Sequence, residues 1–291
     1  MKHSVYLIAP AKLNLNLYVK EKLDNGFHSL NSDICFLDLY DEIIIKPSNL
    51  NKIKVSNKST FFFKEENILS KTLNYFNSEF KNQNKFSITL KKDIPVGAGL
   101  GGGSSDSATL LLGLRYFYNI NPSHSKKITL KKLKEIGLKI GSDVPACIMG
   151  RSLQLSGIGD KLKKISVEKN YKFLLIYPNK VLSTRHVFNN FNVEKVKARK
   201  AMFFNKIKIF NSLECVSQSI EPEIKNILNI LESFEKIIAF GMSGSGSCCF
   251  GIFKNSQDLI NDKEFLRLKS KNNYFIWHGN KKEFGYNRFI Y

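Results

Sequence analysis

The spacing of apolar side chains changes along the chain, and each spacing predicts a different kind of element. In residues 12–19 an apolar side chain occupies every second position, which is typical of a half-buried strand. Leu69, Leu73, Phe76 and Phe80 are three or four residues apart, and this spacing predicts one apolar face of a helix. Both periods occur, so we expect the chain to combine helices with sheets.

The same two patterns predict the remaining elements. We expect further strands at residues 34–39, 42–46, 86–90, 152–156, 172–177, 236–240, 247–253 and 274–278. We expect further helices at residues 105–118, 129–141, 194–219, 223–234 and 256–269, with Thr129 as the N-cap of the second. Helices and strands do not alternate regularly, which favours the α+β class. A chain of 291 residues fits two domains, and we place them at residues 1–155 and 156–291.

Composition restricts the environment of the chain. Hydrophobic residues make up 43%, enough for a large core, and no uncharged apolar stretch approaches the length of a membrane span. The apolar run before Lys12 is too short for a secretory signal, so we expect a cytoplasmic protein without a membrane partner. The five cysteines form no C-x-x-C pair and the five histidines show no metal-ligand spacing, which argues against a disulfide framework or a zinc site.

The net charge of +20 has more than one interpretation. A basic nucleic-acid-binding protein would carry such a charge, and it would bind DNA or RNA in a steeply salt-dependent way. However, the lysines are spread along the chain, and scattered charge gives solubility rather than specificity. Abundant Lys, Asn, Ile and Phe are also typical of an AT-rich coding sequence. We therefore expect no nucleic-acid partner and keep nucleic-acid binding only as an alternative function.

The most informative stretch is residues 94–107, which reads I-P-V-G-A-G-L-G-G-G-S-S-D-S. Glycine has no Cβ, so such a loop can turn several backbone N–H groups toward one point. Ser104 and Ser105 are natural N-cap residues for the helix that follows, and a helix N-terminus attracts anions. No lysine precedes Ser104, which excludes the Walker A loop, and Pro95 with the triple glycine suits a wider loop than the dinucleotide fingerprint. We predict a phosphate-binding loop of another class.

Two further segments carry residues suited to catalysis. In A-P-A-K-L-N-L at residues 9–15, Lys12 and Asn14 project from the same face of a strand. In G-S-D-V-P-A-C at residues 141–147, Asp143 follows a helix and precedes a proline. From the residues alone, Lys12 and Asn14 could be exposed to solvent and Asp143 could make a turn. The alternative for Asp143 is a catalytic carboxylate on a loop.

A second glycine-rich segment, G-M-S-G-S-G-S at residues 241–247, lies between two predicted strands and can also present backbone N–H groups. Together with the three segments above, in this order and spacing, it resembles the GHMP kinase superfamily over nearly the whole chain. The resemblance implies an N-terminal domain like the second domain of ribosomal protein S5 and a ferredoxin-like C-terminal domain. It also implies phosphoryl transfer from ATP, with Mg²⁺, to a small molecule bound between the two.

The segment D-N-G-F-H-S-L at residues 24–30 narrows the implied substrate. It is similar to a segment of the superfamily branch whose substrate carries a cytidine diphosphate group and leads to isoprenoid precursors. Phe27 could stack on the cytosine ring, Phe188 could cover its other face, and His28 could hydrogen-bond its edge. Phe27 stands where that branch usually has tyrosine, so stacking survives while a phenolic hydroxyl is lost. The alternative within the superfamily is a kinase of the homoserine or mevalonate type.

The resemblance also implies roles for individual residues. Asp143 would take the proton of the acceptor hydroxyl, and Lys12 would pair with Asp143 and stabilise charge on the transferred group. The residues implied to bind the phosphates of ATP are Pro95, Gly97, Gly99, Leu100, Gly101, Gly102, Gly103, Ser104 and Ser105. The residues implied to bind the substrate are Asn14, Phe27, His28, Phe188, Ser243 and Gly244. Ser104 is the candidate ligand of Mg²⁺. Asp106 is expected only to complement the helix dipole, and the chain could be a monomer or a homodimer.

Overall fold

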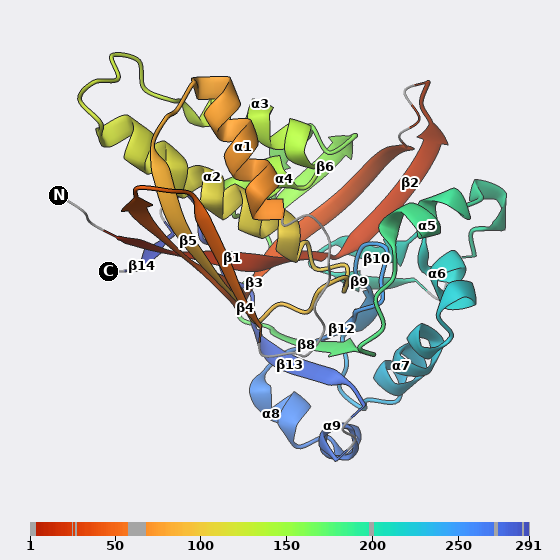
Figure 1. Ribbon diagram of the computed structural model, residues 1–291. Coiled ribbons are helices and arrows are strands. Elements are labelled where there is room, and N and C mark those ends of the chain that lie inside the picture. The colour runs from red at the N-terminus through yellow and green to blue at the C-terminus, as the bar shows by residue number, and fades with distance from the viewer. Residues whose placement is uncertain are drawn as a thin grey trace.

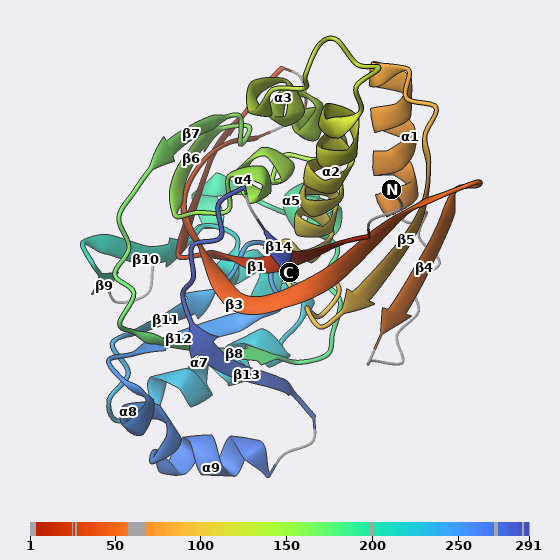
Figure 2. The same ribbon diagram turned by 90° about the vertical axis from the view of Figure 1, so that its left-hand side faces the viewer.

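Two sheets organise the chain, and helices pack against both (Figures 1 and 2). The computed structural model describes residues 4–24, 26, 28–57, 68–197, 201–270, 273–286 and 288–290. The larger sheet holds ten strands and the smaller sheet four. Helices and strands are mixed without a regular βα repeat, which confirms the predicted α+β class.

The larger sheet is built around β3, a strand of 21 residues that spans His28–Ser48. β3 pairs antiparallel with β1, β2, β5 and β6 along different parts of its length. The sheet follows the order β14-β1-β3-β2-β10-β9, with β4 attached to β5 and β7 attached to β6. The other bounds are β1 Val5–Asn14, β2 Asn16–Lys22, β4 Lys52–Asn57, β5 Lys85–Lys92, β6 Leu153–Gly157, β7 Lys161–Lys164, β9 Met202–Phe204, β10 Ile207–Asn211 and β14 Phe289–Ile290.

Four helices lie together over one face of the larger sheet (Figures 1 and 2). They are α1 Ile68–Phe80, α2 Gly102–Ile120, α3 Leu130–Ile140 and α4 Val144–Met149. α2 is central, since it contacts β1 and each of the other three helices, and its Leu110 and Leu111 are fully buried. Thr129 caps α3 as predicted, because its side chain accepts a hydrogen bond from the N–H of Lys132.

The smaller sheet is antiparallel throughout, in the order β11-β12-β8-β13. Its strands are β8 Lys172–Tyr177, β11 Ala239–Met242, β12 Cys249–Phe253 and β13 Phe275–Asn280. The helices of this half are α5 Thr184–Asn189, the 3-10 turn Val193–Lys195, α6 Glu214–Ile220, α7 Glu223–Glu232, α8 Ser256–Ile260 and α9 Lys263–Lys269. β12 is buried along its whole length because α7 and α8 contact it and β8 and β11 flank it.

A shared core joins the two sheets. Leu13 and Leu37 of the larger sheet belong to the same apolar cluster as Leu175 and Phe250 of the smaller sheet. Strands β9, β10 and β14 come late in the chain yet belong to the larger sheet, so the sheets are interwoven in sequence. The boundary between residues 1–155 and 156–291 stays a prediction.

The helix predicted at residues 194–219 is wrong. Where it is described, this region contains a 3-10 turn, the hairpin β9–β10 and, from Glu214 onward, α6. Asn205 and Lys206 form the hairpin turn with φ values of 49° and 66°. Two successive positive φ angles match the twist of paired strands and favour a tight hairpin. The helical spacing of apolar residues here is outweighed by this local turn.

Other boundaries also differ from the prediction. The strand expected at residues 12–19 is divided at Leu15 into β1 and β2, and its residues are buried on both faces for most of its length. The strands expected at residues 34–39 and 42–46 are one continuous strand, β3. The helix expected at residues 256–269 is two short helices, because the side chain of Asp262 accepts from the N–H of Glu264 and starts α9.

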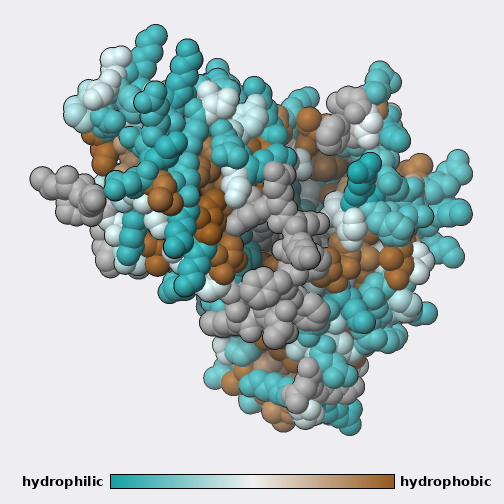
Figure 3. All heavy atoms as spheres, viewed as in Figure 1, coloured by the Kyte–Doolittle hydropathy of each residue, from teal (hydrophilic) through white to brown (hydrophobic). Residues whose placement is uncertain are grey.

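The surface is largely hydrophilic. Figure 3 shows hydrophilic residues over much of one face, with smaller apolar areas between them. In the part of the chain that the structure describes, no helix is long and apolar enough to cross a membrane. All five cysteines are free thiols, and four of them are buried.

Candidate active site

The loop between β5 and α2 carries the predicted phosphate-binding residues and follows a path that only glycine allows. Gly99 has a φ of +76°, and a Cβ there would lie 2.4 Å from the carbonyl oxygen of Ser243 and 2.8 Å from that of Gly246. Gly101 has a φ of +64°, and a Cβ there would lie 3.0 Å from Lys12 Cε. The loop therefore runs in close contact with both the second glycine-rich segment and β1.

Helix α2 begins at Gly102, earlier than predicted. Its N-cap is Gly101, which makes no side-chain cap bond, so the expected N-cap role of Ser104 and Ser105 is wrong. Both serines lie in the first turn, where the N–H of Ser105 donates to Gly101 O at 2.9 Å. The preceding N–H groups have no acceptor within the helix, and the helix dipole is positive there. The buried Ser105 Oγ has no hydrogen-bond partner in the part of the chain that the structure describes, and together with these N–H groups it offers donors to a phosphate.

Lys12 and Asp143 meet beside this loop. Lys12 Nζ lies 3.1 Å from Asp143 Oδ2 and donates to Asn14 Oδ1 at 2.5 Å. Asn14 in turn donates through Nδ2 to Ser32 Oγ at 2.8 Å, which fixes its amide group. The Lys12 side chain is 5% exposed and that of Asp143 33%, so the ammonium is buried while the carboxylate is open to a ligand. Lys12 and Asn14 share a face as predicted, but that face is buried, and solvent exposure of these two residues is excluded.

The local fold leaves the Asp143 carboxylate free for this pairing. Asp143 is the N-cap residue of α4, a helix that the sequence pattern did not predict, and Pro145 lies in its first turn. The Asp143 side chain makes no capping hydrogen bond. A Cβ at Gly101 would lie 3.8 Å from Asp143 Oδ2, so the carboxylate faces the glycine loop. The structure thus brings both predicted catalytic residues to the start of α2.

Ser243 of the second glycine-rich segment, residues 241–247, connects that segment to the phosphate-binding loop and to β1. Its Oγ accepts from the N–H of Asn14 at 3.2 Å and donates to Gly99 O at 3.0 Å. Gly244 has a φ of +58° and leaves room for Gly99 O, which a Cβ would approach to 3.1 Å. Asn211, which the sequence did not single out, donates to the carbonyl oxygens of Met242 and Gly244, both at 2.8 Å. The hydroxyl of Ser243 is therefore engaged within the protein.

Aromatic side chains gather at the end of the site predicted to bind a base. The ring of His28 lies 5.6 Å from that of Phe188 and 5.7 Å from that of Phe191, which was not predicted. Phe188 lies on α5, and Thr184 at the start of α5 hydrogen-bonds Ser245 at 2.9 Å between hydroxyl oxygens. His28 and Phe188 are thus brought together and tied to the second glycine-rich segment. Phe27 lies outside the described residues.

A buried charge cluster under the glycine loop was also missed. Lys92 Nζ lies 2.5 Å from Asp41 Oδ2 and 2.8 Å from Asp106 Oδ2. Asp41 Oδ1 accepts the N–H groups of Asp93 and Ile94, at 2.6 and 2.8 Å, at the point where the loop starts. A Cβ on Gly102 would lie 3.2 Å from Lys92 Nζ. The cluster therefore connects β3, β5 and α2 directly behind the predicted phosphate site.

The members of this cluster titrate differently. Burial lowers the pKa of Lys92, but the two carboxylates outweigh burial and raise it. Burial raises the pKa of Asp106 and Lys92 offsets only part of that rise, so that the pKa is about 8. Among the described residues Asp106 Oδ1 has no hydrogen-bond partner, whereas the side chain of Asp41 accepts three donors. The expectation that Asp106 only complements the helix dipole is wrong.

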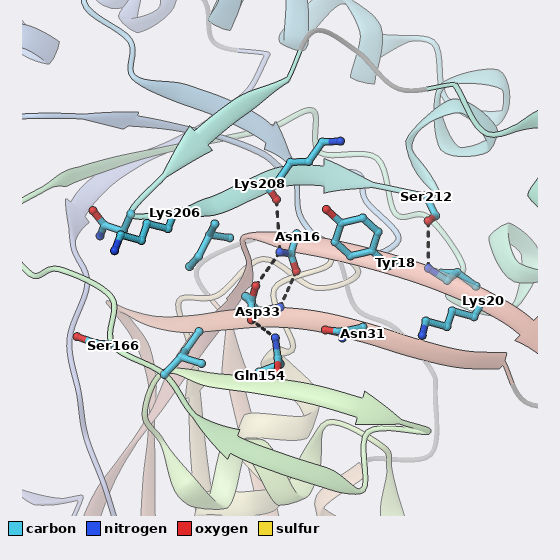
Figure 4. Close-up of a pocket in the computed structure, with 14 residues that line it drawn as sticks. Asn16, Tyr18, Lys20, Asn31, Asp33, Gln154, Ser166, Lys206, Lys208 and Ser212 are labelled. Atoms are coloured by element: carbon cyan, nitrogen blue, oxygen red, sulfur yellow. Dashed lines mark hydrogen bonds between the residues drawn. The ribbon is translucent and has the colours of Figure 1, made fainter.

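A cavity of about 650 Å³ lies apart from these residues, between β2, β3, β6 and the β9–β10 hairpin (Figure 4). Asp33 lies on its floor and accepts from Asn16 Nδ2 at 2.8 Å and from Gln154 Nε2 at 3.2 Å. Lys206 and Lys208 of the hairpin lie on its opposite side (Figure 4). None of the predicted site residues that the structure describes lines this cavity, so we place the active site at the glycine loop.

Comparison with known proteins identifies the family. The model of the GHMP kinases N terminal domain matches residues 67–151, and that of the GHMP kinases C terminal domain matches residues 195–272. A 4-diphosphocytidyl-2-C-methyl-D-erythritol kinase from Clostridioides difficile is 33% identical, over 94% of this chain and 94% of its own. The chain belongs to the 4-diphosphocytidyl-2-C-methyl-D-erythritol kinase family.

Further relatives agree with this family. The kinase of the same name from Polynucleobacter necessarius is 31% identical, over 91% of this chain and 88% of its own. A crystal structure of 4-(cytidine 5'-diphospho)-2C-methyl-D-erythritol kinase shares the fold, with a TM-score of 0.74 at 24% identity, over 95% of this chain and 98% of that one. Homoserine kinase from Cytophaga hutchinsonii shares it with a TM-score of 0.64 at 14% identity, over 97% and 96%. The GHMP kinase fold is confirmed, and the protein is an ATP-dependent small-molecule kinase.

Proposed function

We propose that the protein transfers the γ-phosphate of ATP to the 2-hydroxyl of 4-diphosphocytidyl-2-C-methyl-D-erythritol and releases ADP, a step in isoprenoid precursor synthesis. The observation that carries the proposal is the Lys12–Asp143 pair, 3.1 Å apart, at the N-terminus of α2. Phosphoryl transfer depends mainly on positioning and charge stabilisation, and a base with a cation beside a phosphate loop provides both.

Asp143 is suited to act as the general base. Its carboxylate is partly open, makes no capping bond and faces Gly101 of the loop. An acceptor hydroxyl placed between Asp143 and the γ-phosphate would donate its proton to the carboxylate as the new P–O bond forms. Lys12 is held by Asn14 and Asp143, so its positive charge is fixed where negative charge develops on the transferred group.

The start of α2 would hold the phosphates of ATP. The donors would be the N–H groups of residues 101–104, with the helix dipole adding to their attraction for anions. In the described residues no group of three His, Cys, Asp or Glu forms a metal cage. Mg²⁺ fits such a site because it prefers phosphate oxygens, water and one or two protein ligands. Ser104 Oγ would be the protein ligand, because it lies on the side of α2 that faces the Asp143 loop: a Cβ built on Gly141 would be 3.9 Å from it. The Mg²⁺ ion would neutralise part of the phosphate charge.

The aromatic cluster would bind the cytosine. The rings of Phe188 and Phe191 each lie within 6 Å of the ring of His28, and Phe27 is adjacent to His28 in sequence. Asn14, at the other end, would orient the acceptor hydroxyl group. Ser243 and Gly244 would act by holding the glycine loop against β1, because the Ser243 hydroxyl already bridges Asn14 and Gly99.

Measuring ADP release with purified protein tests the substrate. With ATP and Mg²⁺, we expect steady turnover of 4-diphosphocytidyl-2-C-methyl-D-erythritol and little or none of homoserine or mevalonate. Equal or faster turnover of either competitor would refute the substrate assignment while leaving the kinase family intact. Nucleic acid should neither bind with steep salt dependence nor inhibit the reaction.

A further inference from the structure

Helix α4, whose N-cap residue is Asp143, is too short to be stable without contacts to the rest of the protein. α4 has six residues, and helices of that length are unstable in isolation. The carbonyl groups at its C-terminal end have no partners within the helix. Whatever binds those carbonyl groups therefore fixes the helix, and with it the approach of Asp143 to Lys12.

Arg288, just before β14, binds that end of α4. Its Nη2 donates to the carbonyl oxygens of Cys147 and, at 3.3 Å, of Ile148. Its Nη1 donates to Thr109 Oγ1 of α2 at 3.2 Å, and its Nε donates to Gly285 O at 2.9 Å. One guanidinium thus connects α4, α2 and the C-terminal segment.

The backbone around Arg288 completes this cap. The N–H groups of Phe284 and Gly285 donate to Gly150 O, at 2.8 and 3.1 Å. Gly150 has a φ of +57°, and a Cβ there would lie 2.3 Å from Arg288 Nη2. The guanidinium can reach the helix end only because residue 150 is a glycine.

Arg288 carries a positive charge in a buried position. The residue is 2% exposed, and in the described parts of the chain its recorded partners are carbonyl and hydroxyl oxygens rather than carboxylates. Burial lowers its pKa to about 10, so the guanidinium is still charged at neutral pH. Burying such a charge is unfavourable, and an apolar side chain would fill the space at lower cost. The C-terminal end of a helix is where a positive charge recovers part of that loss.

We propose that Arg288 is a positioning residue for Asp143, which it holds against Lys12 by fixing the far end of α4. Cys147 links the two ends, because its N–H donates to Asp143 O at 2.9 Å while its carbonyl oxygen accepts from Arg288. The inference rests on the proposed role of Asp143 as general base. It assigns the C-terminal segment a part in catalysis at a distance from the substrate.

Arg288→Ala in the full chain tests this role. We expect kcat to fall by at least about tenfold while KM for ATP changes less than about threefold, because only the base moves. Guanidinium ion added to the variant should restore part of kcat. The matched control is Arg151→Ala, since Arg151 lies 5.9 Å from the ring of Tyr286 in the same segment and its Nε has no hydrogen-bond partner among the described residues. The control should keep the wild-type kcat.

A kcat for Arg288→Ala within twofold of wild type overturns the inference, and so does an equal loss in Arg151→Ala. If Arg288→Ala does not fold, Arg288→Lys replaces it, because an ammonium keeps the charge but, with one nitrogen, cannot bind the carbonyl groups of α4 together with Thr109 and Gly285. We expect a kcat about threefold to tenfold below wild type for Arg288→Lys, and an unchanged value overturns the inference.

Hydrogen exchange separates this inference from the proposed function. Backbone N–H groups of residues 143–150 should exchange faster in Arg288→Ala or Arg288→Lys than in wild type or Arg151→Ala. This measurement does not depend on the substrate. An inactive wild type would refute the proposed function, whereas unchanged exchange in the Arg288 variants would refute the positioning role.

Discussion

Replacing Gly99 with alanine should separate the two glycine-rich segments. An alanine at a φ of +76° is strained by about 1–2 kcal/mol. Its Cβ would also meet the carbonyl oxygen of Ser243 at 2.4 Å, so the segments must move apart. That movement breaks the hydrogen bond from Ser243 Oγ to Gly99 O, which contributes about 0.5–1.5 kcal/mol. We expect Gly99→Ala to lower the free energy of unfolding by about 1.5–3.5 kcal/mol.

Gly26→Ala is the matched control for this change. Gly26 has a φ of +82°, but a Cβ there would meet nothing within 4 Å, so the control carries the strain without the clash. Urea unfolding of both variants measures the difference. Gly99→Ala should be the less stable variant and should also raise KM for ATP, because the phosphate loop is displaced. A Gly99→Ala variant as stable as Gly26→Ala, with unchanged KM for ATP, would show that the close approach of the segments is unimportant.

Two further predictions concern the charge cluster behind the loop. Lys92→Met leaves the buried Asp41 and Asp106 without their cation and should destabilise the protein by about 3–5 kcal/mol in urea unfolding. Lys91→Met, which removes an exposed pair with Glu42, should change stability much less. Because the pKa of Asp106 rises from 3.8 when unfolded to about 8 when folded, the folded state binds the extra proton and stability should fall as pH rises through that window. Asp106→Asn should flatten this fall between pH 5 and 8, and an identical pH profile for the variant and wild type would contradict the assignment.

Several parts of the fold and of the candidate site could be predicted from local signals in the sequence. The glycine loop, the Thr129 cap and the apolar face of α1 each depend on residues within a few positions of one another. The helix expected at residues 194–219 failed because a two-residue turn at Asn205 and Lys206 reversed the chain. An Asn-Lys pair is a weak turn signal beside a long stretch with helical spacing.

Contacts between distant parts of the chain could not be read from local pattern. Arg288 and Cys147, or Ser243 and Asn14, meet only because the sheets bring their elements together. Their sequence neighbours give no sign of the partner. Asp41 gave no sign of its burial either, since β3 carries three further acidic residues, Asp33, Asp38 and Glu42.

The Asp143→Asn variant gives the most direct test of the central claim. The change keeps the shape of the side chain and removes its capacity to accept a proton. We expect phosphoryl transfer to 4-diphosphocytidyl-2-C-methyl-D-erythritol to fall by about 10²–10⁴-fold, with ATP binding measured by calorimetry nearly unchanged. Glu232→Gln, at an exposed position on α7, should keep the wild-type rate. A transfer rate for Asp143→Asn close to that of wild type would contradict the account.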